Sequence, residues 1–429
     1  MKLPNFIASN LILKITSLNG FVIAIRLIIS VVIQRLLAVM VGEAGIAKVG
    51  QIRNVMAMLT SISTLGVFNG VVKYLAEYKS DEKTLVKLFS TAFVFIAIGA
   101  VGSAIVLFFG ATYLAEYLFN DESLTIVFKL LAAIVPLIAI NRVFIAVVNG
   151  LSDYKKYAKI DLIGYVLSAL ALLIGLCYFS IEGVIIAIAI TPIIQMLVLI
   201  FIFGKTLKEY IDFKGLRPSL IFKNQLLVFT LMSVVSTLFL NFVELELRTL
   251  ITDKINVEEA GYWTAMTFIS KNYMVFISGL LTLYVIPQFA NIYNQKVFKL
   301  ELLKIYKTIL PLFGIGMVLI YLFRDLVIEI IYPDFTGIKP LFKWQLLGDF
   351  VRLCSIIIAH QFLAKGMVKS FVITEVISLL SFFMLALVLI TDYKTEGVVI
   401  AHFIRYIIYL IAVVIAIKIY FKSQSVGSK

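Results

Sequence analysis

Apolar segments of roughly 20–28 residues recur along the whole chain, and each is long enough to cross the hydrocarbon core of a membrane as an α-helix. Strands of a membrane β-barrel would be about ten residues long, with alternating polarity. Hydrophobic residues make up 62% of the chain and charged residues 15%, whereas soluble domains have about 45–50% and 25%. We therefore predict an all-α integral membrane protein without a sizeable soluble domain. The first apolar run is too long for a cleavable signal peptide.

Twelve spans can be placed along these segments. They run near residues 14–41, 51–77, 86–115, 124–150, 157–179, 183–206, 224–252, 260–291, 300–323, 340–366, 370–391 and 397–420. Lys and Arg concentrate in alternate loops, near residues 79–87, 155–159, 205–223, 296–307 and 365–369, and in the C-terminal tail. By the positive-inside rule these loops and both termini are cytoplasmic, and the loops near Asp121 and Glu258 are periplasmic. Topology thus accounts for the net charge of +13, and we expect no nucleic-acid partner.

Short matches about half a chain length apart indicate an internal repeat. The triplet at Glu43 recurs at Glu259, Lys87 and Thr91 recur as Lys304 and Thr308, and the triplet at Glu182 recurs at Glu396, all at nearly the same offset. The offset covers an even number of spans, so the halves would share one orientation, about a pseudo-two-fold axis along the membrane normal. We predict two six-helix bundles, residues 1–210 and 224–429, joined by a cytoplasmic linker at 211–223. Such parallel repeats hold substrate between them, which predicts a central cavity.

The second span is much less apolar than the first. It carries eight polar residues: Arg53, Asn54, Thr60, Ser61, Ser63, Thr64, Asn69 and Lys73. These groups cannot face lipid, because water is absent there, so they must face other helices or a wet cavity. One interpretation is a polar helix buried for packing alone. The favoured interpretation is one wall of a hydrophilic pathway.

Ionisable residues also lie inside the other spans, where a charge costs roughly 2.5–3.5 kcal/mol on insertion scales. They are Arg26, Arg142, Asp161, Glu244, Arg248, Lys271, Asp349, Arg352, Glu375, His402 and Arg405. They could form ion pairs that lock the bundle; Asp349 and Arg352, three residues apart, can pair within one helix. The favoured alternative is a cavity lining, because the cations outnumber the carboxylates. A cationic lining suits an anionic substrate and above all phosphate, which guanidinium binds with two hydrogen bonds.

Candidate site residues follow from this alternative. The substrate-binding candidates are Arg26, Arg53, Arg142, Arg248, Lys271 and Arg352, and the coupling or gating candidates are Lys73, Glu244, Asp349 and Glu375. Arg26 and Arg352 are each near mid-span, too deep for their side chains to reach the membrane–water interface. We therefore expect them to contact a phosphate of the substrate directly. The sequence has no P-loop, no nucleophile constellation and no His/Cys cluster. We therefore expect neither an enzyme nor a metal site.

Two blocks of the chain carry a family resemblance. The stretch Gly42–Tyr78, with GEAGIAKVGQIRN and GVFNGVVKYLAEY, and the block Leu322–Val376 resemble Wzx-type polysaccharide flippases of the multidrug/oligosaccharidyl-lipid/polysaccharide (MOP) exporter superfamily. Within it they are most similar to the flippases for the lipid-linked precursor of enterobacterial common antigen. In the resembling proteins charges tend to occur at the positions of Arg26, Arg53, Lys73, Arg248, Asp349 and Arg352. Lys271 departs from the family, which carries an acidic residue there.

The resemblance implies a function and a location. It implies that an undecaprenyl-diphosphate-linked oligosaccharide, such as an O-antigen unit, is moved across the bacterial inner membrane by alternating access. No cofactor is implied. Coupling to a proton or sodium gradient is a separate hypothesis, based on Glu244 and Asp349, since a carboxylate close to Arg in a partly dry site can change partner or protonation. A polysaccharide polymerase and chain-length machinery are the implied partners, with the bilayer itself.

Two other functions stay open at this point. A cation-coupled multidrug exporter of the same superfamily would need a carboxylate-rich pocket for its cationic drug, and this lining is rich in Arg. A membrane polysaccharide polymerase or ligase would carry a large periplasmic loop, and no outer loop in this sequence is long. The flippase is therefore the leading hypothesis.

Overall fold

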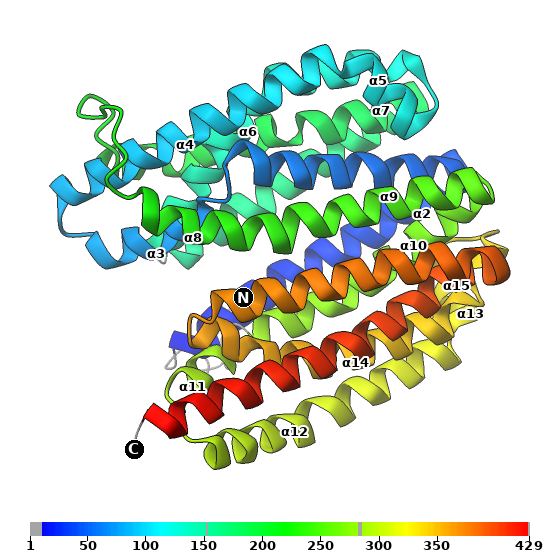
Figure 1. Cartoon of the computed structure of the whole chain (residues 1–429). Helices are drawn as coiled ribbons and strands as arrows, with labels where there is room; N and C mark the ends of the chain where they lie inside the picture. Colours follow the sequence, from blue (N-terminus) through cyan, green and yellow to red (C-terminus); the bar gives the residue numbers. More distant parts are fainter. Residues whose placement is uncertain (1–10, 152, 282–284, 428–429) are drawn as a thin grey trace. The chain divides into compact units, whose positions relative to one another are not determined.

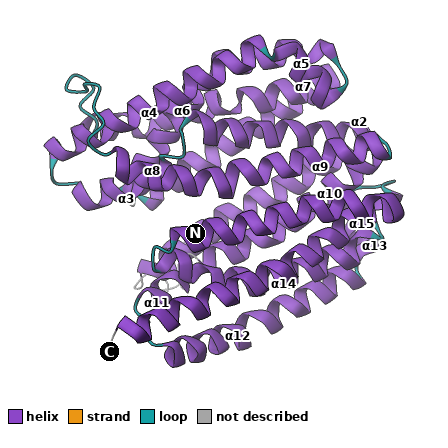
Figure 2. Cartoon of the chain, in the orientation of Figure 1, coloured by secondary structure: helices purple, strands orange, loops and turns teal. Residues whose placement is uncertain are grey.

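The computed structural model describes residues 11–151, 153–281 and 285–427. Within these ranges every regular element is a helix (Figures 1 and 2). The α-helices are α2 Leu11–Ser63, α3 Phe68–Tyr78, α4 Glu82–Phe109, α5 Ala111–Phe119, α6 Thr125–Gly150, α7 Tyr154–Tyr210, α8 Lys223–Ser233, α9 Leu240–Lys254, α10 Val257–Leu280, α11 Ile286–Ala290, α12 Gln295–Leu322, α13 Arg324–Ile331, α14 Leu341–Ala364 and α15 Val368–Gly427. The shorter helical turns are η1 Glu122–Leu124, the π-helical η2 Val234–Phe239 and η4 Thr336–Ile338.

Eight helical stretches in the described ranges are long and apolar enough to cross a membrane. Three of them, of 44, 56 and 56 residues, are long enough to cross twice. Each of these three contains one residue with non-helical backbone angles: Gly42 in α2, Ser180 in α7 and Lys394 in α15. These residues fall between predicted spans, so each long helix is two spans joined by a sharp turn. The more polar α10 lies where the eighth span was predicted.

The turns at Ser180 and Lys394 show the internal repeat in the backbone. Ser180 has φ 52° and ψ −137°, and Lys394 has φ 51° and ψ −138°. Each is followed by a glycine against the preceding helix: a Cβ on Gly183 or on Gly397 would overlap a backbone carbonyl oxygen. Only glycine can occupy such a position. The same hairpin thus occurs in both halves, where the sequence repeats Glu-Gly-Val.

The chain divides into two compact units by its internal contacts. The first contains Met1–Val41 and Gln51–Asn241, and the second contains Gly42–Gly50 and Phe242–Lys429. In the first, α6 packs against α3, α4 and α7, and in the second, α14 packs against α15 and α12 (Figure 1). Within the second unit the two Glu-Ala-Gly copies touch, because a Cβ on Gly261 would overlap the Glu43 carbonyl oxygen. The predicted bundle boundaries, the two-fold axis and the central cavity stay predictions.

The second predicted span is broken, which no local sequence signal indicates. Helix α2 ends at Ser63 and α3 begins at Phe68, with Leu65 at φ 46° and Gly66 at φ 68° between them. Gly66 lies against Ser233, where α8 passes into the π-helical η2, and the Ser61 and Ser233 hydroxyl oxygens are 3.1 Å apart. Two irregular helix segments of the first unit therefore pack on each other.

We expect Gly66→Ala to destabilise the protein by roughly 2–4 kcal/mol, since left-handed backbone angles and steric overlap each cost about 1–2 or more. The added Cβ would lie 2.5 Å from Ser233 Cβ. Thermal unfolding of purified protein measures the effect. Gly102→Ala is the control, because a Cβ on this α4 glycine has open space around it. Equal melting temperatures for the two variants would contradict the packing described.

Candidate functional site

The second unit contains a buried polar cluster centred on Asp349 of α14. Gln345, Asp349 and Arg352 are spaced four and three residues apart, so they share one face of that helix. The Asp349 side chain is 0% exposed. A buried carboxylate of this kind is stable only when several donors surround it.

Five groups from three helices surround the Asp349 carboxylate. The hydroxyls of Ser270 and Tyr273 on α10 donate to its Oδ2. Gln345 Nε2 donates to the same oxygen at 3.1 Å, and His402 Nε2 on α15 lies 3.1 Å from Oδ1. The fifth group is the Arg352 guanidinium. His402 can come this close because α14 has Gly348 there: a Cβ would lie 2.5 Å from the imidazole Cδ2.

Arg352 is only partly compensated by this carboxylate. Its NH1 is 3.7 Å from Asp349 Oδ1, which is beyond hydrogen-bond distance. Its Nε is buried, without a hydrogen-bond acceptor among the described residues. The guanidinium carbon lies 5.7 Å from the centre of the Tyr406 ring, and the side chain is 26% exposed. Arg352 therefore keeps donors that an anion could use.

A second pair in this unit joins α9 to α10. Lys271 Nζ lies 2.6 Å from Glu244 Oε2. One turn further along α9, the buried Arg248 donates from Nε to the Thr264 hydroxyl at 2.7 Å and lies over the Trp263 ring. Position 50 is glycine, and a Cβ there would lie 2.7 Å from Arg248 Nε.

Arg405 and Glu375 form a third group on α15. Arg405 is buried and donates from Nε to Ser378 Oγ at 2.9 Å. Its guanidinium carbon lies 4.7 Å from the centre of the Tyr406 ring. Glu375 accepts a hydrogen bond from the Tyr409 hydroxyl at 2.6 Å. The Arg405 guanidinium thus contacts a hydroxyl and aromatic faces, as cation–π geometry allows.

The first unit brings Arg26, Asp161 and Arg142 together. Arg26 NH1 lies 2.7 and 3.0 Å from the two carboxylate oxygens of Asp161, and the guanidinium lies over the Tyr165 ring. Arg142 lies 3.9 Å from the centre of the Phe68 ring. Arg142 and Asp161 line a small cavity of about 210 Å³. The polar side chains Tyr157 and Gln195 also line it.

Three predicted site residues of the first unit do not line that cavity: Arg26, Arg53 and Lys73. Arg53 is half-buried on α2. Lys73 is exposed on α3, with its ammonium 5.0 Å from the centre of the Tyr74 ring. The other candidates divide into the clusters above, with Arg26 and Arg142 in one unit and Glu244, Arg248, Lys271, Asp349, Arg352 and Glu375 in the other.

Four residues around Asp349 were not predicted as site residues: Ser270, Tyr273, Gln345 and His402. Helical spacing alone could have added Gln345, which is one turn before Asp349 on the same face. Ser270 and Tyr273 are also three residues apart, but the sequence does not say that their face meets α14. Among the described residues there is no group of three or more His, Cys, Asp or Glu that could hold a metal ion.

These clusters contain the groups that anion binding and proton exchange require. A carboxylate held by hydroxyl, amide, imidazole and guanidinium donors can exchange one partner for another without losing all its hydrogen bonds. A guanidinium with a buried, unused N–H can bind an oxyanion. Three other guanidinium groups in the spans contact neutral groups: Arg142 lies over the Phe68 ring, and Arg248 and Arg405 donate to hydroxyl oxygens.

Comparison with known proteins gives matches over nearly the whole chain. A family model described as polysaccharide biosynthesis protein matches residues 48–335. The lipid III flippase of Escherichia coli (strain K12) is 25% identical over 378 residues, which cover 87% of this chain and 90% of the relative. An inward-facing multidrug resistance MATE family transporter of the MOP superfamily matches with a TM-score of 0.80 and 15% identity, over 94% of this chain and 96% of the transporter. The lipid II flippase MurJ, inward closed, matches with a TM-score of 0.68 and 16% identity, over 97% and 90%.

These matches decide the fold and the family. The structural neighbours have the twelve-helix, two-bundle architecture of the MOP superfamily, so the predicted all-α membrane fold is confirmed. The resemblance to polysaccharide flippases is also confirmed, by the family model and by the curated relative named lipid III flippase. Because the family model matches more than half of the chain, the chain belongs to the polysaccharide biosynthesis protein family.

Proposed function

We propose that this protein is a flippase that moves an undecaprenyl-diphosphate-linked oligosaccharide across the bacterial inner membrane. The observation that carries the proposal is the set of guanidinium groups inside the spans: Arg248 and Arg405 are buried, and Arg352 has a buried Nε without an acceptor among the described residues. A diphosphate crossing the membrane needs compensating charge where its water shell is incomplete. The similarity to the lipid III flippase over 87% of the chain supports the same substrate class.

Within this proposal the cations of each unit bind phosphate oxygens in turn. Arg352 and Arg142 are the first candidates, because neither has a carboxylate within hydrogen-bond distance among the described residues. Arg26 would have to exchange its Asp161 partner for a phosphate oxygen. Lys271 would likewise leave Glu244. Arg53 and Arg248 complete the proposed set, and Lys73 and Glu375 stay proposed gating residues.

We propose that a proton or sodium gradient drives the cycle through Glu244 or Asp349. Both carboxylates are held by partners that could release them: Lys271 for Glu244, and His402 with Arg352 for Asp349. Binding of an anion to Lys271 or Arg352 would take one positive partner from the carboxylate, which favours its uptake of a proton or a cation. Both termini would face the cytoplasm, and a polysaccharide polymerase with its chain-length machinery would use the delivered units.

We propose that the protein is a transporter and not an enzyme. The alternative transport function is export of cationic drugs. A cationic drug would need carboxylates that are not already engaged. Asp161, Glu244 and Asp349 each hold a cation, and Glu375 holds a tyrosine hydroxyl. This arrangement favours the flippase.

Proteoliposomes test the function. Purified protein is reconstituted with a labelled undecaprenyl-diphosphate oligosaccharide, and its exposure to a membrane-impermeant glycosidase is followed over time. We expect transfer at least about tenfold faster than in liposomes without protein, and faster still with an imposed proton or sodium gradient. Export of a cationic dye without transfer of the lipid would refute the flippase. If the transfer rate depended on the gradient in both the Glu244→Gln and the Asp349→Asn proteins as it does in the wild type, these carboxylates would not be the coupling residues.

A further inference from the structure

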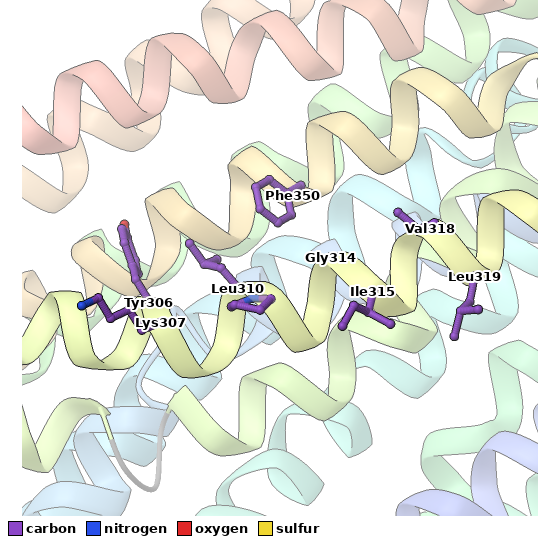
Figure 3. A pocket seen from close by; sticks show the side chains of 9 residues that line it. Tyr306, Lys307, Leu310, Gly314, Ile315, Val318, Leu319 and Phe350 are labelled. Atoms are coloured by element: carbon purple, nitrogen blue, oxygen red, sulfur yellow. The ribbon is translucent and has the colours of Figure 1, made fainter.

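Helices α12 and α14 of the second unit enclose an apolar groove that the transport proposal does not use. It has a volume of about 680 Å³ and follows α12 from Tyr306 to Leu319, with Phe350 of α14 as its opposite wall (Figure 3). These fourteen residues of helix correspond to about 20 Å, which is more than half the thickness of the hydrocarbon core. Side chains beside the groove are exposed and apolar, with Leu312 74% exposed. In a membrane-spanning chain this surface meets lipid.

One end of the groove is basic. Lys307 lies beside Tyr306 at that end, and Leu319 lies at the other (Figure 3). The Tyr306 hydroxyl donates to the Cys354 carbonyl at 2.6 Å, which fixes this end wall. The basic surface continues toward the start of α12 through the exposed Lys296, Lys299 and Lys304, the last of which lies 4.0 Å from Glu301.

The lysines and the groove share one helix face. Lys307 lies close to three helical turns after Lys296. Gly314 lies about two turns after Lys307, and Val318 lies about one turn after Gly314. A ligand lying in the groove would therefore extend onto the lysines rather than away from them. The groove is open at Gly314 because that position has no side chain, and Phe350 lies across from it.

A backbone acceptor lies at the same end. Pro311 has no N–H, so it cannot donate to the Lys307 carbonyl four residues before it. A headgroup that carries both a phosphate and a hydroxyl could bind the ammonium and this carbonyl together.

We propose that this groove binds an anionic phospholipid of the cytoplasmic leaflet, with one acyl chain along α12 and its phosphate at Lys307. Three features favour this ligand. The wall is apolar for about the length of a chain that fills one leaflet, the cations lie at only one end, and the positive-inside rule assigns that end to the anionic cytoplasmic surface. The proposal stands on the groove, its basic end and the predicted topology, and it does not depend on the transported substrate.

Two glycines of α12 give a matched pair of variants. A Cβ on Gly314 would lie 3.5 Å from Phe350, an ordinary contact, and a Cβ on Gly316 would meet nothing within 4 Å. Both positions thus accept a side chain, and leucine favours helix over glycine. Gly314→Leu fills the groove, whereas Gly316→Leu adds the same side chain elsewhere on the same helix.

The test is native mass spectrometry of the purified full chain, titrated with phosphatidylglycerol or phosphatidylcholine of identical acyl chains. We expect the wild-type protein and Gly316→Leu to bind phosphatidylglycerol roughly fivefold more tightly than phosphatidylcholine, and Gly314→Leu to lose roughly fivefold in affinity for both. Lys307→Gln should remove the preference and keep the phosphatidylcholine affinity.

Three results would overturn the proposal. Equal affinities of the wild-type protein for the two lipids would show that the basic end does not select the headgroup. An equal loss of lipid affinity in Gly314→Leu and Gly316→Leu would show that the groove is not the binding site. Tighter binding of a polyprenyl phosphate than of phosphatidylglycerol, lost in Gly314→Leu, would assign the groove to a prenyl chain instead.

Discussion

Replacement of Asp349 by alanine is expected to lower the stability of the folded protein by roughly 3–5 kcal/mol, the range for a buried charge network that loses one partner. The carboxylate accepts from Ser270, Tyr273 and Gln345, and it also contacts His402 and Arg352. Alanine would leave these donors buried without an acceptor. Thermal unfolding and the yield of monodisperse protein after purification measure the loss.

Asp325→Ala is the matched control in the same unit. Asp325 is exposed on α13 and pairs with Lys339 at 2.8 Å, and hydrogen bonding to that lysine lowers the pKa of its carboxyl. Exposed ion pairs contribute little to stability, so we expect no measurable change in melting temperature. A similar melting temperature for Asp349→Ala and Asp325→Ala would mean that the buried cluster does not stabilise the unit.

Helix α14 shows how much of this cluster can be predicted from the sequence. The span was correct, and the helical period places Gln345, Asp349 and Arg352 on one face. What the period cannot give is the partner helices. His402 reaches Asp349 because Gly348 lets this part of α15 approach α14. The contact therefore depends on packing between the tenth and twelfth predicted spans, which are not consecutive.

The break at Leu65 and Gly66 escaped prediction for a related reason. The sequence there has no proline and reads as one continuous helix. Its left-handed angles are set by the contact of Gly66 with Ser233, which belongs to a different helix. The hairpins at Ser180 and Lys394 also lacked a local signal, yet the repeat of Glu182-Gly183 as Glu396-Gly397 marked both of them.

Charge counting along the spans revealed the surplus of cations but not their pairing. Arg26 and Lys271 each lie within 3 Å of a carboxylate, so part of the predicted cationic lining consists of ion pairs. Ion pairing and anion binding are therefore not exclusive interpretations. In the proposed transport cycle, Asp161 would compensate the Arg26 guanidinium at rest and a phosphate would compensate it during transport, at a smaller cost than an isolated charge would carry.

Replacement of Arg352 by alanine is expected to leave the protein near its normal abundance but to slow transfer of the lipid-linked oligosaccharide about 10- to 100-fold. One hydrogen bond to a charged group contributes about 1.5–3 kcal/mol, which is that range. Abundance should hold because Asp349 keeps four other partners: Ser270, Tyr273, Gln345 and His402. Arg352→Lys should restore transfer only in part, since an ammonium lacks the planar fork of guanidinium. Expression level and the proteoliposome assay give the two readouts.

The double variant Arg352→Ala with Asp349→Ala separates phosphate contact from a structural role. If Arg352 served only to neutralise Asp349, removal of both charges would recover abundance and transfer together. The structure argues against that recovery, because removal of Asp349 also takes the acceptor from Ser270, Tyr273 and Gln345. Arg324→Ala is the control, because Arg324 is half-buried on α13 and donates to the Tyr321 carbonyl through an exposed hydrogen bond. Normal transfer by Arg352→Ala, or an abundance as low as that of Asp349→Ala, would rule out a direct phosphate contact as the main role of Arg352.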